Sequence, residues 1–425
     1  MNPASPIPAG ALAGRPTLAF VDATRSGSGR ILWGMTVVER QVRELARLGI
    51  ARVAVWTSEA VAPTVRRLRA DFHDLYTVEV RFPLASGPEE LGRALAEVDE
   101  PVLLLQGDVV YDERVLAELV QTGPGIAVIG VDGAGAVHLE PAQARSLGAG
   151  LGAGRPLAEL ADEAGCRRRR PEELEQYVPS LRLVMVPLLE RVPGTGSLGR
   201  LERLMYRRTF KGVIDAVARY GYYHLVRWIT RGLSRTSLTP NLFTVLSVVA
   251  VWAAVPCFAA GRFGLGVAVA WVGVLLDSVD GKLARLRLHL SESMGAFEHL
   301  AAMPGLGLWY AATGWHLSGS QLLTTLPMAL VTWGFLAAFL ADKAVTGGFR
   351  SLTGRELFDV RPLDAAFHLV AARRNVSLVL LTLGALADRV AWAFTVAAAW
   401  TVATLLFHAV RFSWLVRRRG AAAGS

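Results

Sequence analysis

The chain has 425 residues, of which 52% are hydrophobic and 19% are charged, and its formal net charge is +9. Because soluble domains average about 25% charged residues, this composition excludes a wholly soluble protein and, more firmly, a disordered one. The two cysteines, Cys166 and Cys257, exclude a disulfide scaffold or a multi-cysteine metal site, and the positive charge suggests a membrane surface, a nucleotide or a nucleic acid as partner.

Short β-rich runs alternate with helical patterns in the first part of the chain. We expect strands at 16–23, 51–58, 76–82, 101–112 and 125–131, and helices at 36–49, 58–72, 87–98 and 113–123. This alternation predicts an N-terminal α/β domain, residues 1–200, whose mostly parallel sheet is covered by helices on both faces. Residues 140–200 have little periodicity, and the arginine run 167–170 within them indicates a solvated face.

Two polar features follow predicted strands, at the carboxyl ends where such sheets bind ligands. A glycine-rich loop follows the first strand, and Asp108 follows the fourth. This arrangement resembles the sugar-phosphate nucleotidyltransferase family, in which the loop cradles a triphosphate and the aspartate holds magnesium. The matching residues are Gly27, Gly29, Arg30 and Asp108, but the family's lysine is missing because no lysine precedes Lys211. The alternative is a sheet that keeps the fold without transfer activity.

Residues 201–236 mix arginines and aromatic residues with aliphatic residues at helical spacing. An amphipathic helix of this kind next to a membrane span is expected to lie in the headgroup plane, with its arginines near lipid phosphates. It serves either as an anchor alone or also as a source of positive charge for an anionic substrate.

Long apolar runs fill residues 237–420, where we expect six membrane spans of roughly 20 residues each. The spans lie near 242–260, 264–280, 295–315, 321–341, 376–392 and 394–414. Most loop arginines and lysines fall on one side, and the first residues lack the pattern of a signal peptide. We therefore expect a multi-pass protein of the inner plasma membrane, with the N-terminal domain and the C-terminus in the cytoplasm.

The second expected span contains ionisable residues, which are costly in an apolar helix and usually functional. Asp277 and Asp280 are three residues apart, so both carboxylates share one helix face and can bind one cation. Gly281 and Ala284 leave room for a bulky ligand near the backbone. Arg285, one turn further, can bind a phosphate or pair with an aspartate.

This pattern resembles the signature of the CDP-alcohol phosphotransferase family: Asp277, Asp280-Gly281, Ala284-Arg285 and Gly295, where the family adds two further aspartates. The run Thr239-Pro240-Asn241 with Thr244 resembles the family's entry into its first span, and the likeness covers roughly residues 205–415. It implies transfer of a phospho-alcohol group from a CDP-alcohol donor to a hydroxyl acceptor, with release of CMP, in phospholipid or inositol-phosphate-type synthesis. The fused arrangement resembles bifunctional inositol-phosphate cytidylyltransferase and CDP-inositol phosphotransferase enzymes, whose front domain makes the CDP-alcohol.

The resemblance also implies cofactors, partners and site residues. It implies Mg²⁺ or Mn²⁺ as cofactor, membrane lipids and a hydroxyl or lipid acceptor as partners, and a homodimer, without nucleic acid. The metal ligands it implies are Asp277, Asp280 and His299. The substrate-binding residues it implies are Asp277, Gly281, Ala284, Arg285, Asn241 and Thr244.

Two family positions are occupied by other residues. Counting from Gly295, the third family aspartate, a metal ligand, falls on His299, and the fourth, the base, falls on Met303. Methionine cannot act as a base, whereas His299 can accept a proton or bind a metal, although imidazole suits softer metals than magnesium. Glu298 is adjacent, and a small rotation of the helix would aim its carboxylate at the metal. We expect His299 or Glu298 to be catalytic; otherwise both are polar residues at a helix interface.

Three hypotheses follow from these substitutions. The chain is a working phosphotransferase with altered ligands, or a catalytically impaired pseudoenzyme that binds nucleotide or lipid as a partner subunit. In the third hypothesis, the N-terminal domain is an active nucleotide-sugar enzyme and the membrane part is mostly an anchor.

Overall fold

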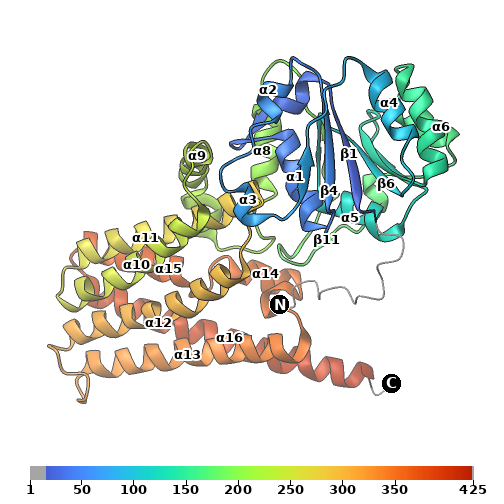
Figure 1. The fold of residues 1–425 in the computed structure, drawn as a ribbon. Helices are drawn as coiled ribbons and strands as arrows, with labels where there is room; N and C mark the ends of the chain where they lie inside the picture. Colours follow the sequence, from blue (N-terminus) through green and yellow to red (C-terminus); the bar gives the residue numbers. More distant parts are fainter. Residues whose placement is uncertain (1–15, 424–425) are drawn as a thin grey trace.

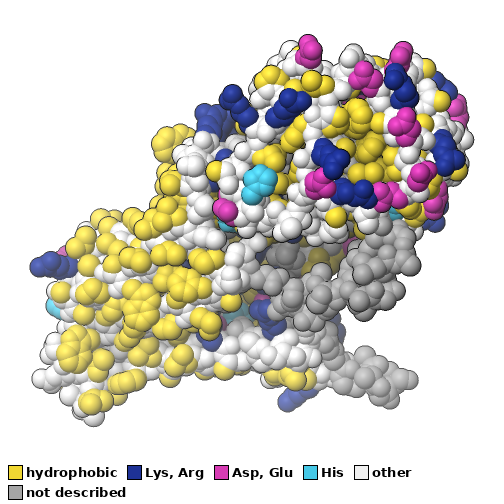
Figure 2. Space-filling model, in the orientation of Figure 1, with side chains coloured by type: hydrophobic (Ala, Val, Ile, Leu, Met, Phe, Trp, Pro, Cys, Tyr) yellow, Lys and Arg dark blue, Asp and Glu magenta, His cyan; other side chains and the backbone are white. Residues whose placement is uncertain are grey.

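The computed structural model describes residues 16–423, without the side chains of Glu292, His299 and residues 419–423. An α/β domain is joined to a bundle of long helices (Figure 1). Hydrophobic side chains cover much of the bundle face seen in Figure 2, whereas charged side chains are spread over the α/β domain. The predicted fold class is therefore confirmed in its coarse form, an N-terminal α/β domain followed by a helical region.

A seven-stranded sheet forms the centre of the α/β domain, in the order β10-β8-β9-β6-β1-β4-β5. Its strands are β1 (Leu18–Ala23), β4 (Arg52–Thr57), β5 (Glu79–Arg81), β6 (Val102–Gln106), β8 (Ile126–Ile129), β9 (Gly135–Leu139) and β10 (Arg167–Arg169). β1 pairs in parallel with β4 and β6, and β9 runs antiparallel to β6 and β8. The sheet is mostly parallel, as predicted, and β9 is a strand that the sequence pattern did not indicate.

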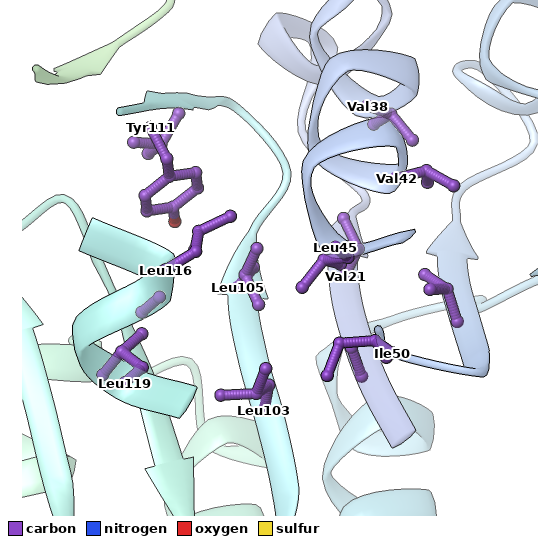
Figure 3. Close-up of a cluster of buried hydrophobic side chains, with 14 of the residues drawn as sticks. Val21, Val38, Val42, Leu45, Ile50, Leu103, Leu105, Tyr111, Leu116 and Leu119 are labelled. Carbon is purple, nitrogen blue, oxygen red and sulfur yellow. The ribbon is translucent and has the colours of Figure 1, made fainter. Parts of the chain in front are cut away.

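One face of the sheet packs against α1 (Val37–Arg47) and α5 (Glu113–Thr122). The cluster in Figure 3 contains Val21 and Leu105 from the sheet, Leu45 from α1 and Leu116 from α5, all fully buried. Because both faces of a central parallel strand are covered, these strands are apolar throughout rather than alternating.

The opposite face packs against α4 (Pro88–Ala96), α6 (Pro141–Gly152) and α7 (Leu157–Glu163). α4 and α6 approach at Gly92 and Gly148, where a Cβ on either glycine would lie 2.2 or 2.3 Å from the other's carbonyl oxygen. The glycine-rich stretch that looked poorly periodic is thus a helix whose small residues permit this close contact.

The helix expected at 58–72 is instead two short helices, α2 (Ala62–Val65) and α3 (Phe72–Leu75). Between them, Arg69 donates hydrogen bonds to the carbonyl oxygens of Gly34 (3.0 Å) and Thr236 (2.9 Å). The prediction of one helix was wrong because contacts with the helical region favour an irregular connection here.

The helical region contains α8 (Gly199–Arg207), α9 (Tyr223–Ser234), α10 (Pro240–Ala259), α11 (Phe263–Arg287), α12 (Glu292–Leu317), α13 (Pro327–Thr353), α14 (Pro362–His368), α15 (Arg374–Leu386) and α16 (Val390–Ala423). Four described segments are long and apolar enough to cross a membrane: α10, α11, α13 and residues Val390–Arg418 of α16. The third expected span falls in α12, and the fifth falls in α15, which has only 13 residues. Six spans are therefore not confirmed.

The single amphipathic helix expected at 201–236 is divided into α8, a π-helical turn (Val217–Gly221) and α9. Leu201 and Tyr206 of α8 pack in one cluster with Trp33 and Val110 of the α/β domain. α9 instead exposes Trp228, which is 74% accessible. The amphipathic segment thus continues the domain's core at one end and presents an aromatic side chain at the other.

A buried carboxyl in α1 makes the stability of the fold depend on pH. Burial raises the pKa of Glu44 to about 8, against the lowering effect of Arg40. The folded state therefore holds a proton that the unfolded state releases near the ordinary glutamate pKa of 4.5, so the stabilisation is complete below that pH and is lost as the pH rises towards 8. Glu44→Gln is expected to raise the melting temperature at pH 8 by roughly 2–5 °C and to leave it unchanged at pH 4.

Thermal unfolding of the full-length chain in detergent, at both pH values, measures this difference. Glu89→Gln is the matched control because Glu89 lies exposed in α4. An equal shift at both pH values for Glu44→Gln would contradict the assignment.

Candidate functional site

Asp280 of α11 is the most enclosed carboxylate of the expected site. It is 5% exposed, and its Oδ2 has no hydrogen-bond partner among the described atoms. Thr244 of α10 lies close to it, and the Thr244 hydroxyl donates to the Pro240 carbonyl oxygen (3.4 Å). The two helices can approach because a Cβ on Gly273 would already lie 3.2 Å from the Ser247 carbonyl oxygen. The structure thus brings together two of the predicted site residues, from the first and second expected spans.

Asp277 lies at the meeting point of three helices. It forms an ion pair with Arg374 at the start of α15, and Glu298 of α12 lies close to it. The sequence predicted Glu298 as a neighbour of the site, whereas Arg374 lies outside the motifs that indicated site residues. Arg374 and Asp277 are 97 residues apart in the chain, so no local sequence pattern could have indicated that they form an ion pair.

A chain of buried polar groups supports this corner of the site. The Asn375 side chain donates to Asp215 (2.9 Å) and to the Tyr222 hydroxyl oxygen (3.0 Å), and the Ser278 hydroxyl donates to Tyr222 (3.3 Å). These residues fix the start of α15 against α11 and thereby hold the Arg374 side chain towards Asp277. None of the four was predicted, because the contacts are made only in the folded chain.

The remaining predicted residues lie on the same two helices, α10 and α11. The Arg285 guanidinium folds back over Gly281, where a Cβ would lie 3.2 Å from its Nη2. Ala284 is half-buried on α11, and Asn241 is half-buried in the first turn of α10. The space that Gly281 leaves is therefore partly taken by Arg285, which has to move for a ligand to approach the backbone there.

The two substituted family positions lie on α12. The side chain of His299 is outside the described residues, so its role stays a prediction, and Met303 is 38% exposed. Among the side chains that the structure describes, no three histidine, cysteine or carboxylate groups converge as a metal centre. Two aspartates still fit Mg²⁺, because this ion is usually held by one or two protein carboxylates together with substrate phosphates. The unpartnered Oδ2 of Asp280 supplies such a ligand.

The glycine-rich loop of the α/β domain is occupied by the chain's own residues. Arg30 donates to the carbonyl oxygens of Gly194 (2.8 Å) and Gly196 (2.6 Å). A Cβ on Gly27 would lie 2.2 Å from the Val192 carbonyl oxygen, and one on Gly29 would lie 3.3 Å from Thr64. The side of the loop expected to face a triphosphate therefore faces the segment 192–196.

The second polar feature of this domain is likewise engaged. Asp108 is 4% exposed, and its Oδ2 accepts a hydrogen bond from Arg191 (2.8 Å) and lies 3.5 Å from Arg25. The predicted residues are close together, as expected from the sheet. Asp108 is paired with two arginines of its own domain, and its Oδ1 has no hydrogen-bond partner among the described residues.

Comparison with known proteins gives matches to the helical region. Residues 237–299 match the family model for CDP-alcohol phosphatidyltransferase. Phosphatidylinositol phosphate synthases of Mycobacterium bovis and Mycobacterium tuberculosis are 30% identical over 142 residues, which are 32% of this chain and 64% of each relative. The chain thus spans slightly less than two thirds of the length of these relatives.

Two crystal structures of the Mycobacterium tuberculosis phosphatidylinositol phosphate synthase are also similar to part of the chain. The structure with CDP-DAG bound is 19% identical, with 44% of this chain and 93% of that chain covered and a TM-score of 0.34. The structure in complex with manganese and citrate is 20% identical, with 44% and 88% covered and a TM-score of 0.35. From the family model and the sequence relatives, we conclude that the chain carries a CDP-alcohol phosphatidyltransferase domain homologous to phosphatidylinositol phosphate synthase.

Proposed function

We propose that this chain is a membrane phosphotransferase that moves a phospho-alcohol group from a CDP-alcohol donor to a hydroxyl acceptor and releases CMP. The observation that supports this most directly is the buried Asp280, whose carboxylate has an unpartnered oxygen within the segment that matches the family model. A carboxylate in an apolar helix costs free energy and is retained where it binds something. The names of the sequence relatives favour a product in phospholipid or inositol-phosphate-type synthesis.

The donor is proposed to bind along α11 and the start of α10. Asp277 and Asp280 hold Mg²⁺ or Mn²⁺, with His299 as a further proposed ligand. When bound there, the cation would supply positive charge that favours departure of CMP. The remaining proposed donor contacts are Gly281, Ala284, Arg285, Asn241 and Thr244.

Arg374 and Glu298 have separate proposed roles at Asp277. Arg374 keeps the Asp277 carboxylate in one orientation through their ion pair. Glu298 takes the proton of the acceptor hydroxyl, whose oxygen then attacks the phosphorus that bears the alcohol. The bond between that phosphorus and the bridging oxygen breaks, and the electron pair leaves with CMP. Glu298 takes this role because Met303, at the family's base position, cannot accept a proton.

A second candidate is a binding subunit without turnover. Two observations favour it: Asp277 is already paired with Arg374, and a methionine stands at the family's base position. Such a protein would bind a CDP-alcohol or lipid in the same site and act through a partner.

The α/β domain is proposed to lie in the cytoplasm, next to the inner membrane, and to lack nucleotidyl transfer. Arg30 and Asp108 are bonded to residues of their own domain, and the family's lysine is missing. Pyrophosphate release from CTP by the full-length chain would contradict this proposal.

An assay of CMP release tests the proposed function. Purified full-length chain, in lipid nanodiscs with Mg²⁺ or Mn²⁺, is given a panel of CDP-alcohols, including CDP-diacylglycerol and CDP-inositol, with inositol phosphate or lipid acceptors. CMP release that requires both acceptor and cation supports the phosphotransferase. Cation-dependent binding of a CDP-alcohol without CMP release from any pair supports the binding subunit instead.

A further inference from the structure

The last turn of α11 ends against the α/β domain. Three consecutive carbonyl groups each accept a hydrogen bond from a different side chain of that domain: those of Leu286, Arg287 and Leu288 from Arg40 (2.5 Å), Arg43 (3.3 Å) and Tyr76, respectively. The last carbonyls of a helix have no partner within the helix, and cations are favoured at this negative end of the helix dipole. The α/β domain therefore supplies the hydrogen-bond donors and the positive charge that the last carbonyl groups of α11 lack within the helix.

These side chains are themselves fixed by burial and pairing. Arg40 and Arg43 are 4% and 0% exposed. Arg43 is held by Glu39 (2.6 Å) and Asp71 (2.8 Å), and Asp71 also lies 3.1 Å from the ring of His289, the next residue after the capped carbonyls. Because buried charges are tolerated only when they are paired, this network has one favoured arrangement, and it includes the end of α11.

The side chain of Arg287 ties the same turn to α9 and its linker. Its guanidinium donates to four carbonyl oxygens, those of Leu233 (2.7 Å), Ser234 (2.8 Å), Thr236 (2.7 Å) and Leu238 (2.5 Å). The α/β domain reaches this point through Gly34, which has φ +77°. A Cβ on Gly34 would lie 1.6 Å from the Ser234 carbonyl oxygen, so only glycine permits this approach.

We infer that the α/β domain is the C-terminal cap of α11 and that Arg40, Arg43 and Tyr76 are positioning residues for Asp277 and Asp280. Asp280 lies seven residues before Arg287, about 10 Å along the helix axis. A rotation or shift of the capped end therefore moves both carboxylates relative to Thr244 and Arg374. Displacements near 1 Å at reacting groups can cost about a hundredfold in rate. The positioning role in catalysis rests on the proposed function. The capping of α11 by the α/β domain does not depend on the proposed function.

Tyr76→Phe tests the cap with a small change, because it removes one hydroxyl and one hydrogen bond. Tyr111→Phe is the matched control: its hydroxyl is also buried and donates to the Gly135 carbonyl (2.6 Å), but within the α/β domain. In the full-length chain, Tyr76→Phe is expected to lower kcat about tenfold with KM for the CDP-alcohol unchanged within twofold. It is also expected to speed amide hydrogen exchange in residues 281–291. Tyr111→Phe is expected to change none of these quantities.

Arg40→Met and Arg40→Lys supply a second test. Lysine can still place a donor and a charge at the Leu286 carbonyl, so Arg40→Lys is expected to recover most of the rate and protection that Arg40→Met loses. If exchange in residues 281–291 is the same in Tyr76→Phe, Arg40→Met and wild type, the cap is overturned. If exchange speeds up while kcat is unchanged, the positioning role is overturned. If the wild type releases no CMP, the proposed function fails, and the exchange measurement alone decides the cap.

Discussion

Replacing Asp280 with asparagine is expected to lower CMP release by the full-length chain by at least about a thousandfold. The change keeps the size of the side chain but removes the charge of a buried carboxylate whose Oδ2 has no partner within the described residues. Since Asp277 and Asp280 are the two anionic side chains among the proposed ligands of the cation, loss of one charge removes a large share of its binding. CMP formation with Mg²⁺ and with Mn²⁺ measures the effect on rate, and binding of Mn²⁺ followed by electron paramagnetic resonance measures the effect on the cation.

Asp388→Asn is a suitable control for this experiment. Asp388 is an exposed aspartate of the same helical region and has φ +53°, a conformation that asparagine adopts readily. It lies beyond the end of α15 opposite to Arg374, so the same chemical change there is expected to leave the rate unaltered. An Asp280→Asn variant with more than a tenth of the wild-type rate would mean that the reaction occurs elsewhere.

Glu298→Gln is expected to lower kcat about a hundredfold to ten-thousandfold, the usual contribution of a general base. Glutamine keeps the shape beside Asp277 but cannot take the acceptor's proton. The rise of kcat with pH that ionisation of this base produces should disappear in the variant. Rates measured across pH 5 to 10 for wild type and variant test both expectations, because Glu298 is half-buried beside Asp277 and Asp280 and therefore ionises above the usual range of a carboxyl group.

Adding Met303→Asp to this variant distinguishes a lost base from a damaged site. The double variant places a carboxylate at the family's base position and is expected to recover at least about tenfold of the lost rate. A Glu298→Gln variant with unchanged kcat and pH profile would remove Glu298 from the mechanism and leave His299 as the base.

The sequence predicted those parts of the fold whose pattern is local. The strand and helix alternation of the α/β domain follows from apolar runs that must be buried on both faces, and β1, β4 and β6 lie where expected. The helix expected at 58–72 failed because Arg69 and Asp71 make contacts outside their own segment. The expected fifth span is not confirmed, because α15 ends at Leu386 after 13 residues.

The residues of the candidate site also fall into two groups, those that a local pattern could predict and those that meet only through tertiary packing. Residues at helical spacing on α11, with Thr244 on the adjacent helix, could be predicted because their proximity is set by one helix and one short connection. Arg374 could not, because its approach to Asp277 depends on how α15 packs. Asn375 and Asp215 are 160 residues apart and meet only in the folded chain.

The cap on α11 also restricts which residues at the domain interface can be substituted and whether the two domains can be separated. On the membrane side, the accepting groups are carbonyl oxygens, which every amino acid carries, so these three hydrogen bonds do not themselves restrict the identity of residues 286 and 288. On the other side, the donors are the side chains of Arg40, Arg43 and Tyr76, so a replacement there has to carry an N–H or O–H group of similar reach. If the gene were divided at residue 236, the C-terminal fragment would have no hydrogen-bond donors for the last carbonyl groups of α11. In the N-terminal fragment, Arg40 and Arg43 would become exposed to solvent. The sequence suggests two separate domains. Because they share this interface, we expect that one domain cannot be replaced by a homologous domain without the other.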